Sequence, residues 1–152
     1  YAGSFVDPTI GKELAMAQFE QGADIIYQVA GLTGEGVIAA AKETGNFAIG
    51  VDSNQDWIAE GNVIVSVIKR VDNLVYDYAK AAVDDTFESG YGVAGLSENG
   101  VGLSWDIGST YFEDNGPEDM VSMMPEVKAA VEEYREKILS GEITVTNLLL
   151  EE

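Results

Sequence analysis

Two polar side chains stand where predicted strands end, and their types suit the binding of a sugar. Asp52 follows the apolar run 47–51 and precedes three further polar residues. Its carboxylate could accept hydrogen bonds from two neighbouring hydroxyl groups, at about 1.5–3 kcal/mol each. Lys69, in the only adjacent pair of basic residues, could bind a ligand oxygen. A turn cap for Asp52 and a solvated charge for Lys69 are the structural alternatives, and the pattern alone leaves them open.

A glycine-rich loop, Gly31–Gly36, has the spacing G-x-x-G-x-G and leads into a predicted helix. Amide groups at a helix start are unpaired within the helix, so we expect them to point outward, where Gly31 and Gly34 would let a ligand approach. The spacing matches neither the dinucleotide-binding fingerprint nor a phosphate-binding loop with its Lys. A turn shaped for packing is the structural alternative.

Three aromatic residues, Tyr27, Phe47 and Trp57, could stack on a base, a contact of about 1–3 kcal/mol. Tyr27 and Phe47 lie in predicted strands, where core packing is the ordinary role. Trp57 lies in a polar loop near Asp52, and there packing and ligand contact are equally expected.

The composition disfavours several kinds of chemistry. With no Cys and no His, the chain lacks thiolate nucleophiles, imidazole bases and the usual zinc ligands. A formal net charge of −19 disfavours nucleic acid as a partner. The acidic pairs Asp84-Asp85 and Glu132-Glu133 fit solvated helix faces, and the stretch 114–119 lacks the order of a calcium loop. We expect no metal, no cofactor and no enzymatic turnover.

The first half of the chain alternates between strand and helix patterns. Asp7-Pro8 predicts the start of a helix whose buried face carries Ile10, Leu14 and Ala17. Helical crossovers join parallel strands, so we expect an α/β fold: a three-layer Rossmann-like or flavodoxin-like lobe, with a mostly parallel sheet and helices on both faces. The loops after the second and third strands then share one rim. The expected elements are strands at 1–5, 24–29 (buried on both faces) and 47–51, and helices at 8–21 and 34–44.

The second half is less regular. Its apolar runs and turn signals, among them Asn99-Gly100, predict a sequence of short elements. These are a strand at 63–68, a helix at 71–87, a hairpin of strands 90–96 and 100–105, an irregular acidic stretch at 106–125, a helix at 125–140 and a last strand at 143–150.

A length of 152 residues suits one domain with its own core. No apolar run approaches the roughly 20 residues that span a bilayer. The chain opens at Tyr1 without an initiator Met or a leader sequence, so we expect a piece of a longer protein.

Five groups of residues, in this order, resemble the basic membrane protein family, the PnrA-like nucleoside-binding lipoproteins of ABC transporters. The ordered set covers nearly the whole chain. The groups are Gly3-Ser4-Phe5-x-Asp7, Gly22-Ala23-Asp24-Ile25-Ile26, Ala30-Gly31-x-Thr33-Gly34-x-Gly36-Val37, Ile49-Gly50-Val51-Asp52-Ser53-x-Gln55 and Ser66-x-x-Lys69-Arg70-Val71-Asp72.

The resemblance implies a half-molecule of a two-lobed binding protein. Family members have two lobes of the type I periplasmic-binding-protein fold and hold a nucleoside in the cleft between them, whereas residues 1–152 resemble only the carboxyl-terminal half. By this resemblance Asp52 would hold the ribose hydroxyls and Lys69 would reach the ribose side. The backbone of Gly31, Thr33 and Gly34 would line the cleft, and Tyr27 would stack on the base.

The resemblance also implies partners and a location. The expected ligand is a nucleoside, with a purine ahead of a pyrimidine. The expected protein partners are the missing amino-terminal lobe and an ABC permease. The full-length protein would be an extracytoplasmic lipoprotein anchored to the cell membrane.

Residues 62–90 would cross to the missing lobe in such a protein. The apolar stripe Val71, Leu74, Val75 and Tyr78 then needs another partner, because leaving these side chains exposed would cost roughly 6–12 kcal/mol, at 1.5–3 kcal/mol each. We expect the segment to fold back on its own sheet or to exchange with a second copy of the chain, giving a homodimer.

Three classes of function remain open. As a binding module, the single lobe should show millimolar or undetectable affinity, because it offers about half of the contacts. The second class is an isolated or engineered half-lobe that self-associates and binds no ligand of its own. The third, an enzyme on a flavodoxin-like or Rossmann-like sheet, is disfavoured by the missing His, Cys and phosphate-binding fingerprint.

Overall fold

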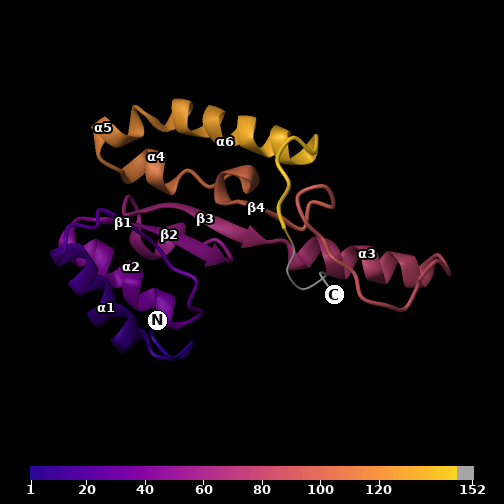
Figure 1. The fold of residues 1–152 in the computed structure, drawn as a ribbon, viewed down its shortest axis with the longest axis horizontal. Helices are drawn as coiled ribbons and strands as arrows, with labels where there is room; N and C mark the ends of the chain where they lie inside the picture. The colour runs from indigo at the N-terminus through magenta and orange to yellow at the C-terminus, as the bar shows by residue number, and fades with distance from the viewer. Residues whose placement is uncertain (147–152) are drawn as a thin grey trace.

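A four-stranded sheet between two layers of helices forms the body of the chain (Figure 1). The structure is a computed structural model and describes residues 1–146. Strands β1, β2 and β3 run parallel, and β4 pairs antiparallel with β3. The mostly parallel α/β architecture predicted from the sequence is confirmed. In sheet order the strands are β1 (Ile25–Tyr27), β2 (Phe47–Asp52), β3 (Val63–Lys69) and β4 (Val101–Leu103).

The helices divide between the two faces of the sheet. Two lie on one face, α1 (Pro8–Glu20) and α2 (Thr33–Thr44). The other face lies below a layer of three, α4 (Tyr111–Asn115), α5 (Glu118–Val121) and α6 (Met124–Leu139). Helix α3 (Val71–Val83) projects beyond the sheet, and the short 3-10 helices η1 (Asp56–Ala59) and η2 (Ser104–Ile107) follow β2 and β4. No helix within residues 1–146 combines the length and apolar character of a membrane span.

Helix α1 begins as the sequence predicts but buries a different face. The Asp7 carboxylate accepts hydrogen bonds from the N–H groups of Thr9 and Ile10 at 3.0 and 3.2 Å. The buried face is Gly11, Ala15 and Phe19, not Ile10, Leu14 and Ala17. The reason is a close helix contact: a Cβ atom on Gly11 would lie 2.0 Å from the carbonyl oxygen of Thr33, so only glycine lets α1 approach α2 here.

The core lies between the α1–α2 layer and the sheet. Ile38, Ala40 and Ala41 of α2 are fully buried against Ala48 of β2 and Val63 of β3. Small residues on α2 allow the helix to sit close to the strands. Beneath this layer, β1 and β2 pair in parallel, with Tyr27 opposite Ile49 at their carboxyl ends.

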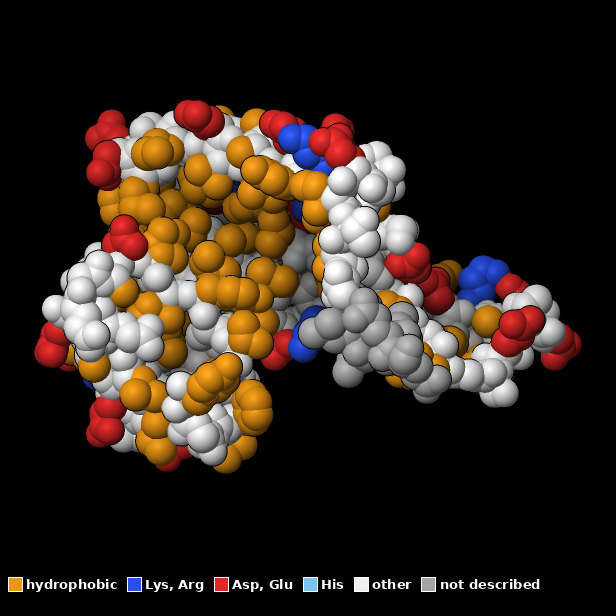
Figure 2. Space-filling view, viewed as in Figure 1, with side chains coloured by type: hydrophobic (Ala, Val, Ile, Leu, Met, Phe, Trp, Pro, Cys, Tyr) orange, Lys and Arg blue, Asp and Glu red, His pale blue; other side chains and the backbone are white. Residues whose placement is uncertain are grey.

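The opposite face of the sheet is less closely covered. Phe112 of α4 is fully buried and meets the Phe47 ring edge-on, with centroids 6.1 Å apart. Between the sheet and α6, an apolar groove of about 550 Å³ remains. Figure 2 shows hydrophobic side chains gathered over this side of the molecule. The groove is lined by Ile25, Tyr27, Ile49, Ile64, Val65, Val67, Leu103, Trp105, Met120, Met123, Met124, Val127 and Val131.

Two strand predictions in the first half are wrong or incomplete. Residues 1–5 form no strand. The run 24–29 contains only the three-residue strand β1, and it is not buried on both faces, since Ile25 and Tyr27 are 41% and 50% exposed. β1 is the outer strand of the described sheet and pairs only with β2, so its apolar side chains line the groove instead of a closed core.

The second half also departs from its predicted hairpin. Of the predicted hairpin, only Val101–Leu103 forms a strand, and residues 90–96 form none. The turn itself is present, with Asn99 at a φ of 53°. The stretch 106–125, predicted to be irregular, contains α4 and α5. Of the predicted last strand, residues 143–146 are not in a strand and 147–150 lie outside the described residues.

Helix α3 stands away from the sheet and has no buried residue (Figure 1). The helix predicted over 71–87 ends at Val83. Within residues 62–90, residues 63–69 form β3 in the sheet, whereas α3 does not fold back on the sheet in the single chain. Exchange with a second copy stays a prediction.

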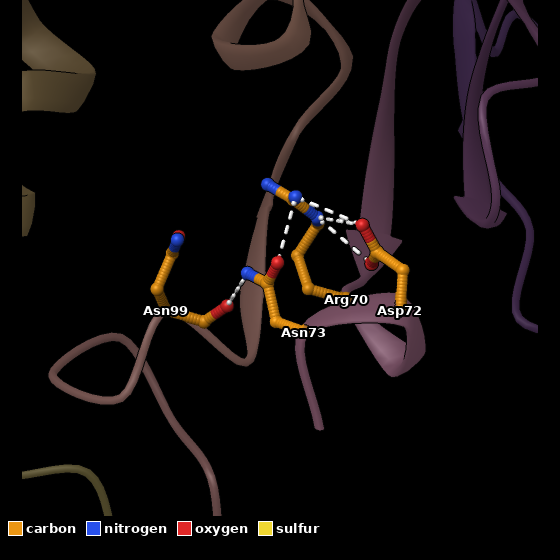
Figure 3. A network of polar contacts seen from close by, with 4 residues as sticks. All are labelled: Arg70, Asp72, Asn73 and Asn99. Carbon is orange, nitrogen blue, oxygen red and sulfur yellow. Dashed lines mark hydrogen bonds and ion pairs between the residues drawn. The ribbon is translucent and has the colours of Figure 1, made fainter. Parts of the chain in front are cut away.

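A polar clamp joins the base of α3 to the turn before β4 (Figure 3). The Arg70 guanidinium donates hydrogen bonds to the Asp72 carboxylate and, at 3.0 Å, to the Asn73 side-chain oxygen. The Asn73 amide nitrogen donates to the Asn99 carbonyl at 3.0 Å. The Arg70 hydrogen bond holds the pKa of Asp72 below its ordinary value. The clamp therefore ties the first turn of α3 to the turn before β4.

Candidate ligand-binding site

The loops that follow β1 and β2 lie side by side at one rim of the sheet, as the parallel topology predicts. A hydrogen bond of 2.8 Å from the Gln28 side-chain nitrogen to the Gln55 side-chain oxygen joins them. Gln28 directly follows β1, and Gln55 closes the polar corner that begins at Asp52. The rim expected from the sequence therefore exists, and an amide pair that the sequence analysis did not single out holds it together.

Asp52 occupies a strained position at the end of β2. Its φ of 70° is in the left-handed region that non-glycine residues seldom adopt. The Ser53 N–H donates to the Val51 carbonyl at 2.9 Å, which closes a three-residue turn around Asp52. Such strain costs about 1–3 kcal/mol and tends to occur at functional positions.

Lys69 lies beside Asp52 on the neighbouring strand. Asp52 pairs with Ile68 in the β2–β3 ladder, and the Lys69 ammonium reaches the Asp52 carboxylate at 2.6 Å. The two side chains are 64% and 48% exposed, so their ion pair contributes only about 0–1 kcal/mol. The structure thus brings together the two residues predicted to bind a sugar, and leaves both within reach of a ligand.

The glycine-rich loop differs from its predicted form at the start of α2. The N–H groups of Thr33, Gly34 and Glu35 donate to the carbonyls of residues 5, 31 and 32, at 3.3, 3.0 and 3.1 Å. The expectation of unpaired, outward-pointing amides is wrong at these three positions, because the segment before α1 and the first tight turn of α2 occupy them. Gly31, at a φ of 57°, supplies the turn that leads into the helix.

Thr33 and Gly34 are both buried in this loop. The Thr33 hydroxyl donates to the Ser4 carbonyl at 3.0 Å and accepts from the Asp7 N–H at 2.9 Å, so it ties α2 to the segment before α1. At Gly34, a Cβ atom would lie 1.8 Å from the Gln28 side-chain oxygen. Ligand contacts at Gly31, Thr33 and Gly34 stay predictions.

Two of the aromatic candidates, Tyr27 and Trp57, are exposed. Tyr27 is 50% exposed at the end of β1, on the edge of the apolar groove. Trp57 is 60% exposed, and its indole N–H donates to the Asn54 carbonyl at 3.1 Å. Both rings are therefore exposed to solvent near the carboxyl ends of β1 and β2. Stacking on a ligand stays a prediction for each ring.

A buried polar cluster supports the rim and was missed in the sequence. The Asp56 carboxylate accepts hydrogen bonds from the hydroxyls of Ser66 and Ser109, both at 2.6 Å. The Ser66 hydroxyl also accepts from the Gln55 N–H at 3.0 Å, and the Ser104 hydroxyl accepts from the Ser66 N–H at 3.0 Å. Ser66 within the apolar run 63–68 was the one available signal, since a lone hydroxyl in a buried strand needs a partner.

Residues 1–148 match the sequence profile of a family described as ABC transporter substrate-binding protein, PnrA-like. This chain belongs to that family. The match confirms the resemblance read from the five residue groups.

Curated relatives carry related names. An uncharacterised lipoprotein of Pyrococcus abyssi is 37% identical, over 94% of this chain and 42% of its own length. The ABC transporter nucleoside-binding protein BmpA of Lactococcus lactis is 32% identical, over 95% of this chain and 42% of its own length. The chain therefore spans less than half the length of these relatives.

A similar solved structure is also about twice as long as this chain. The crystal structure of an ABC transporter system solute-binding protein from Aeropyrum pernix superposes with a TM-score of 0.78 at 36% identity. The superposition covers 97% of this chain and 47% of that protein. Its α/β organisation agrees with the Rossmann-like lobe described above.

Proposed function

We propose that this chain is one lobe of a two-lobed, extracytoplasmic nucleoside-binding protein, and that Asp52 and Lys69 recognise the ribose. The observation that carries the proposal is the Asp52 turn: a carboxylate in a strained conformation, paired with a lysine at the carboxyl ends of parallel strands. Ligands of open α/β sheets bind at such rims. No step of this function changes a covalent bond.

The Asp52–Lys69 pair offers both kinds of hydrogen-bonding group that a ribose needs. The carboxylate accepts from two vicinal hydroxyls, and the ammonium donates to a ribose oxygen. Because the ion pair is exposed, it contributes little free energy, and a ligand that separates the two side chains therefore costs little. Hydrogen bonds to charged groups then contribute about 1.5–3 kcal/mol each.

The base would lie toward the exposed rings of Tyr27 or Trp57. Stacking on one ring contributes about 1–3 kcal/mol, and a purine offers more ring area than a pyrimidine. We therefore rank purine nucleosides ahead of pyrimidine nucleosides. The backbone at Gly31, the partly exposed start of the glycine-rich loop, would line the cleft beside the sugar.

The rest of the cleft would come from a second lobe. The relatives are about twice as long as the span matched here, and one carries the name of a nucleoside-binding protein. By analogy with relatives named lipoproteins, the longer protein would be anchored outside the membrane by a lipid and would deliver its ligand to an ABC permease. A lobe that supplies half of the contacts should bind with millimolar or weaker affinity.

The test is a titration of this chain with inosine, guanosine, adenosine and uridine, followed by NMR chemical shifts, which detect millimolar binding. Asp52→Ala should weaken binding and reduce the shifts at the rim, because it removes the carboxylate that accepts hydrogen bonds from the ribose hydroxyls. Asp24→Ala, which removes an exposed carboxylate before β1, is the matched control and should leave them intact. A submicromolar dissociation constant, or unchanged binding by Asp52→Ala, would contradict the proposal.

A second candidate is a self-associating unit that binds no ligand. The observation that favours it is α3, a helix with an apolar stripe and no buried residue. Absence of shifts with all four nucleosides, together with a stable dimer, would support this alternative.

A further inference from the structure

We propose that the side-chain amides of Gln28 and Gln55 form a bridge that fixes the spacing between the two rim loops. Both glutamines are then positioning residues for the ligand site. The consequence for binding rests on the proposed function, whereas the bridge itself can be tested without a ligand. Neither residue has to touch the ligand for this role.

The direction of every hydrogen bond in the bridge is set by the backbone. The Val51 N–H can only donate, so the Gln55 atom that it meets at 2.9 Å is the oxygen Oε1. The same oxygen meets Gln28 at 2.8 Å, so Gln28 presents its nitrogen Nε2. The Gln28 oxygen is thereby left to accept from the Ala30 N–H at 3.3 Å. Each end of the bridge is thus a backbone amide of one rim loop.

Burial makes the bridge more than a surface contact. Gln28 is only 3% exposed, and a buried amide costs free energy unless its donors and acceptors are paired. The space for the two side chains comes from glycines. A Cβ atom on Gly34 would lie 1.8 Å from Gln28 Oε1, and one on Gly50 would lie 3.0 Å from Gln55 Oε1. Neither glycine has a positive φ. The Gln28 amide therefore requires glycine at position 34, whereas at Gly50 the Ser66 hydroxyl oxygen, at 2.3 Å, is nearer to the added Cβ than Gln55 is.

The bridge also holds the Asp52 turn. Val51 carries the carbonyl that closes the turn and the N–H that Gln55 binds. The Gln55 backbone N–H is fixed in turn to the Ser66 hydroxyl of β3 at 3.0 Å. The position of Asp52 relative to the Gly31 loop is therefore set by a chain of hydrogen bonds from β3 through Gln55 to Gln28.

The test compares amide hydrogen exchange, resolved by NMR, in the chain and four variants. Gln55→Met removes the side-chain oxygen that accepts from Gln28 and from the Val51 N–H. The readout is the Ala30 N–H in the other loop, whose exchange should become about threefold to tenfold faster. Gln55→Glu should retain protection at Ala30, because a carboxylate accepts from both the Gln28 nitrogen and the Val51 N–H. Gln28→Met should speed exchange at Val51, and Gln21→Met, at the exposed end of α1, should change neither amide.

Wild-type protection of Ala30 in Gln55→Met would overturn the bridge, as would equal loss in Gln55→Met and Gln55→Glu. If Gln28→Met fails to fold, the two Gln55 variants still decide the matter, since Gln55 is only partly buried. Titration with inosine adds the functional arm: Gln55→Met should weaken binding about tenfold and Gln55→Glu by less than twofold. If wild-type protein binds no nucleoside, the proposed function fails while the exchange result still decides the bridge.

Discussion

At the scale of residues, we expect Asp56 to contribute more to the stability of the rim than the candidate ligand-binding residues Asp52 and Lys69 do. Its carboxylate is 3% exposed and joins η1 to β3 and to the segment after η2 through Ser66 and Ser109. Asp56→Ala would leave the buried Ser66 hydroxyl and the partly buried Ser109 hydroxyl without their acceptor, and we expect it to lower the free energy of unfolding by about 2–4 kcal/mol. Urea unfolding measures this.

The exposed Asp114 provides the comparison for Asp56. Its side chain accepts a hydrogen bond from the Thr110 hydroxyl on the surface of α4. Asp114→Ala should therefore cost about 1 kcal/mol or less. Equal losses in the two variants would mean that the buried cluster is not what stabilises this region.

Sequence reasoning at this scale found the exposed pair and missed the buried support. Asp52 and Lys69 could be predicted because both follow apolar strands, and parallel topology brings such positions together. Gln28 and Asp56 could not, because their roles depend on partners 27 and 53 positions away in the sequence. No local pattern encodes such contacts.

At the scale of elements, the clamp at the base of α3 makes a prediction about pH. Hydrogen bonds from Arg70 lower the pKa of Asp72 in the folded chain. The clamp therefore contributes its full stability to α3 at pH values above about 3.9, the pKa of an Asp carboxyl group in an unfolded chain. That contribution is lost as the pH falls through the lower pKa of the folded state. An NMR titration of the Asp72 carboxyl group should find a midpoint below about 3.9.

Two variants locate the cause of the Asp72 shift. Arg70→Leu should return the midpoint to the ordinary range, because the first cause of the shift is the Arg70 hydrogen bond. Lys80→Leu removes a cation from the same helix that pairs instead with Asp84, and should leave the Asp72 midpoint unchanged. A Lys80 effect as large as that of Arg70 would show that general charge, not the clamp, controls the pKa.

Elements with local signals were predictable, and those that depend on neighbours were not. The start of α1 is set by Asp7 and Pro8, and the end of α2 by Gly45 at a φ of 71°, all of which the sequence displays. The face that α1 buries was wrong because it is chosen by the close contact with α2 at Gly11. The burial of β1 was wrong because an apolar run does not reveal that its strand lies at the edge of the described sheet.

At the scale of the whole molecule, the chain exposes apolar surface that a single lobe does not cover. Helix α3 exposes Val71, Val75 and Tyr78 at 58%, 63% and 49%. Each such side chain gains about 1.5–3 kcal/mol on full burial. We expect the chain to form a homodimer through α3, the exposed helix within residues 62–90, and sedimentation equilibrium should give twice the monomer mass.

A charge on the α3 stripe should separate the two copies. Val75→Asp places a carboxylate in the expected interface and should give a monomer. Val6→Asp makes the same change at a site 75% exposed outside the segment, and should leave the dimer intact. A monomeric wild-type chain with α3 exposed would contradict the exchange.

The most direct test of the central claim removes the ribose hydroxyls and Asp52 separately and together. Adenosine and 2′,3′-dideoxyadenosine are titrated into the wild-type chain and into Asp52→Ala, with binding followed by NMR shifts at the rim. If Asp52 binds the hydroxyls, the dideoxy ligand binds more weakly to the wild-type chain, and Asp52→Ala binds both ligands equally weakly. If the variant still prefers adenosine by the wild-type ratio, the ribose is recognised elsewhere and the assignment of this rim is wrong.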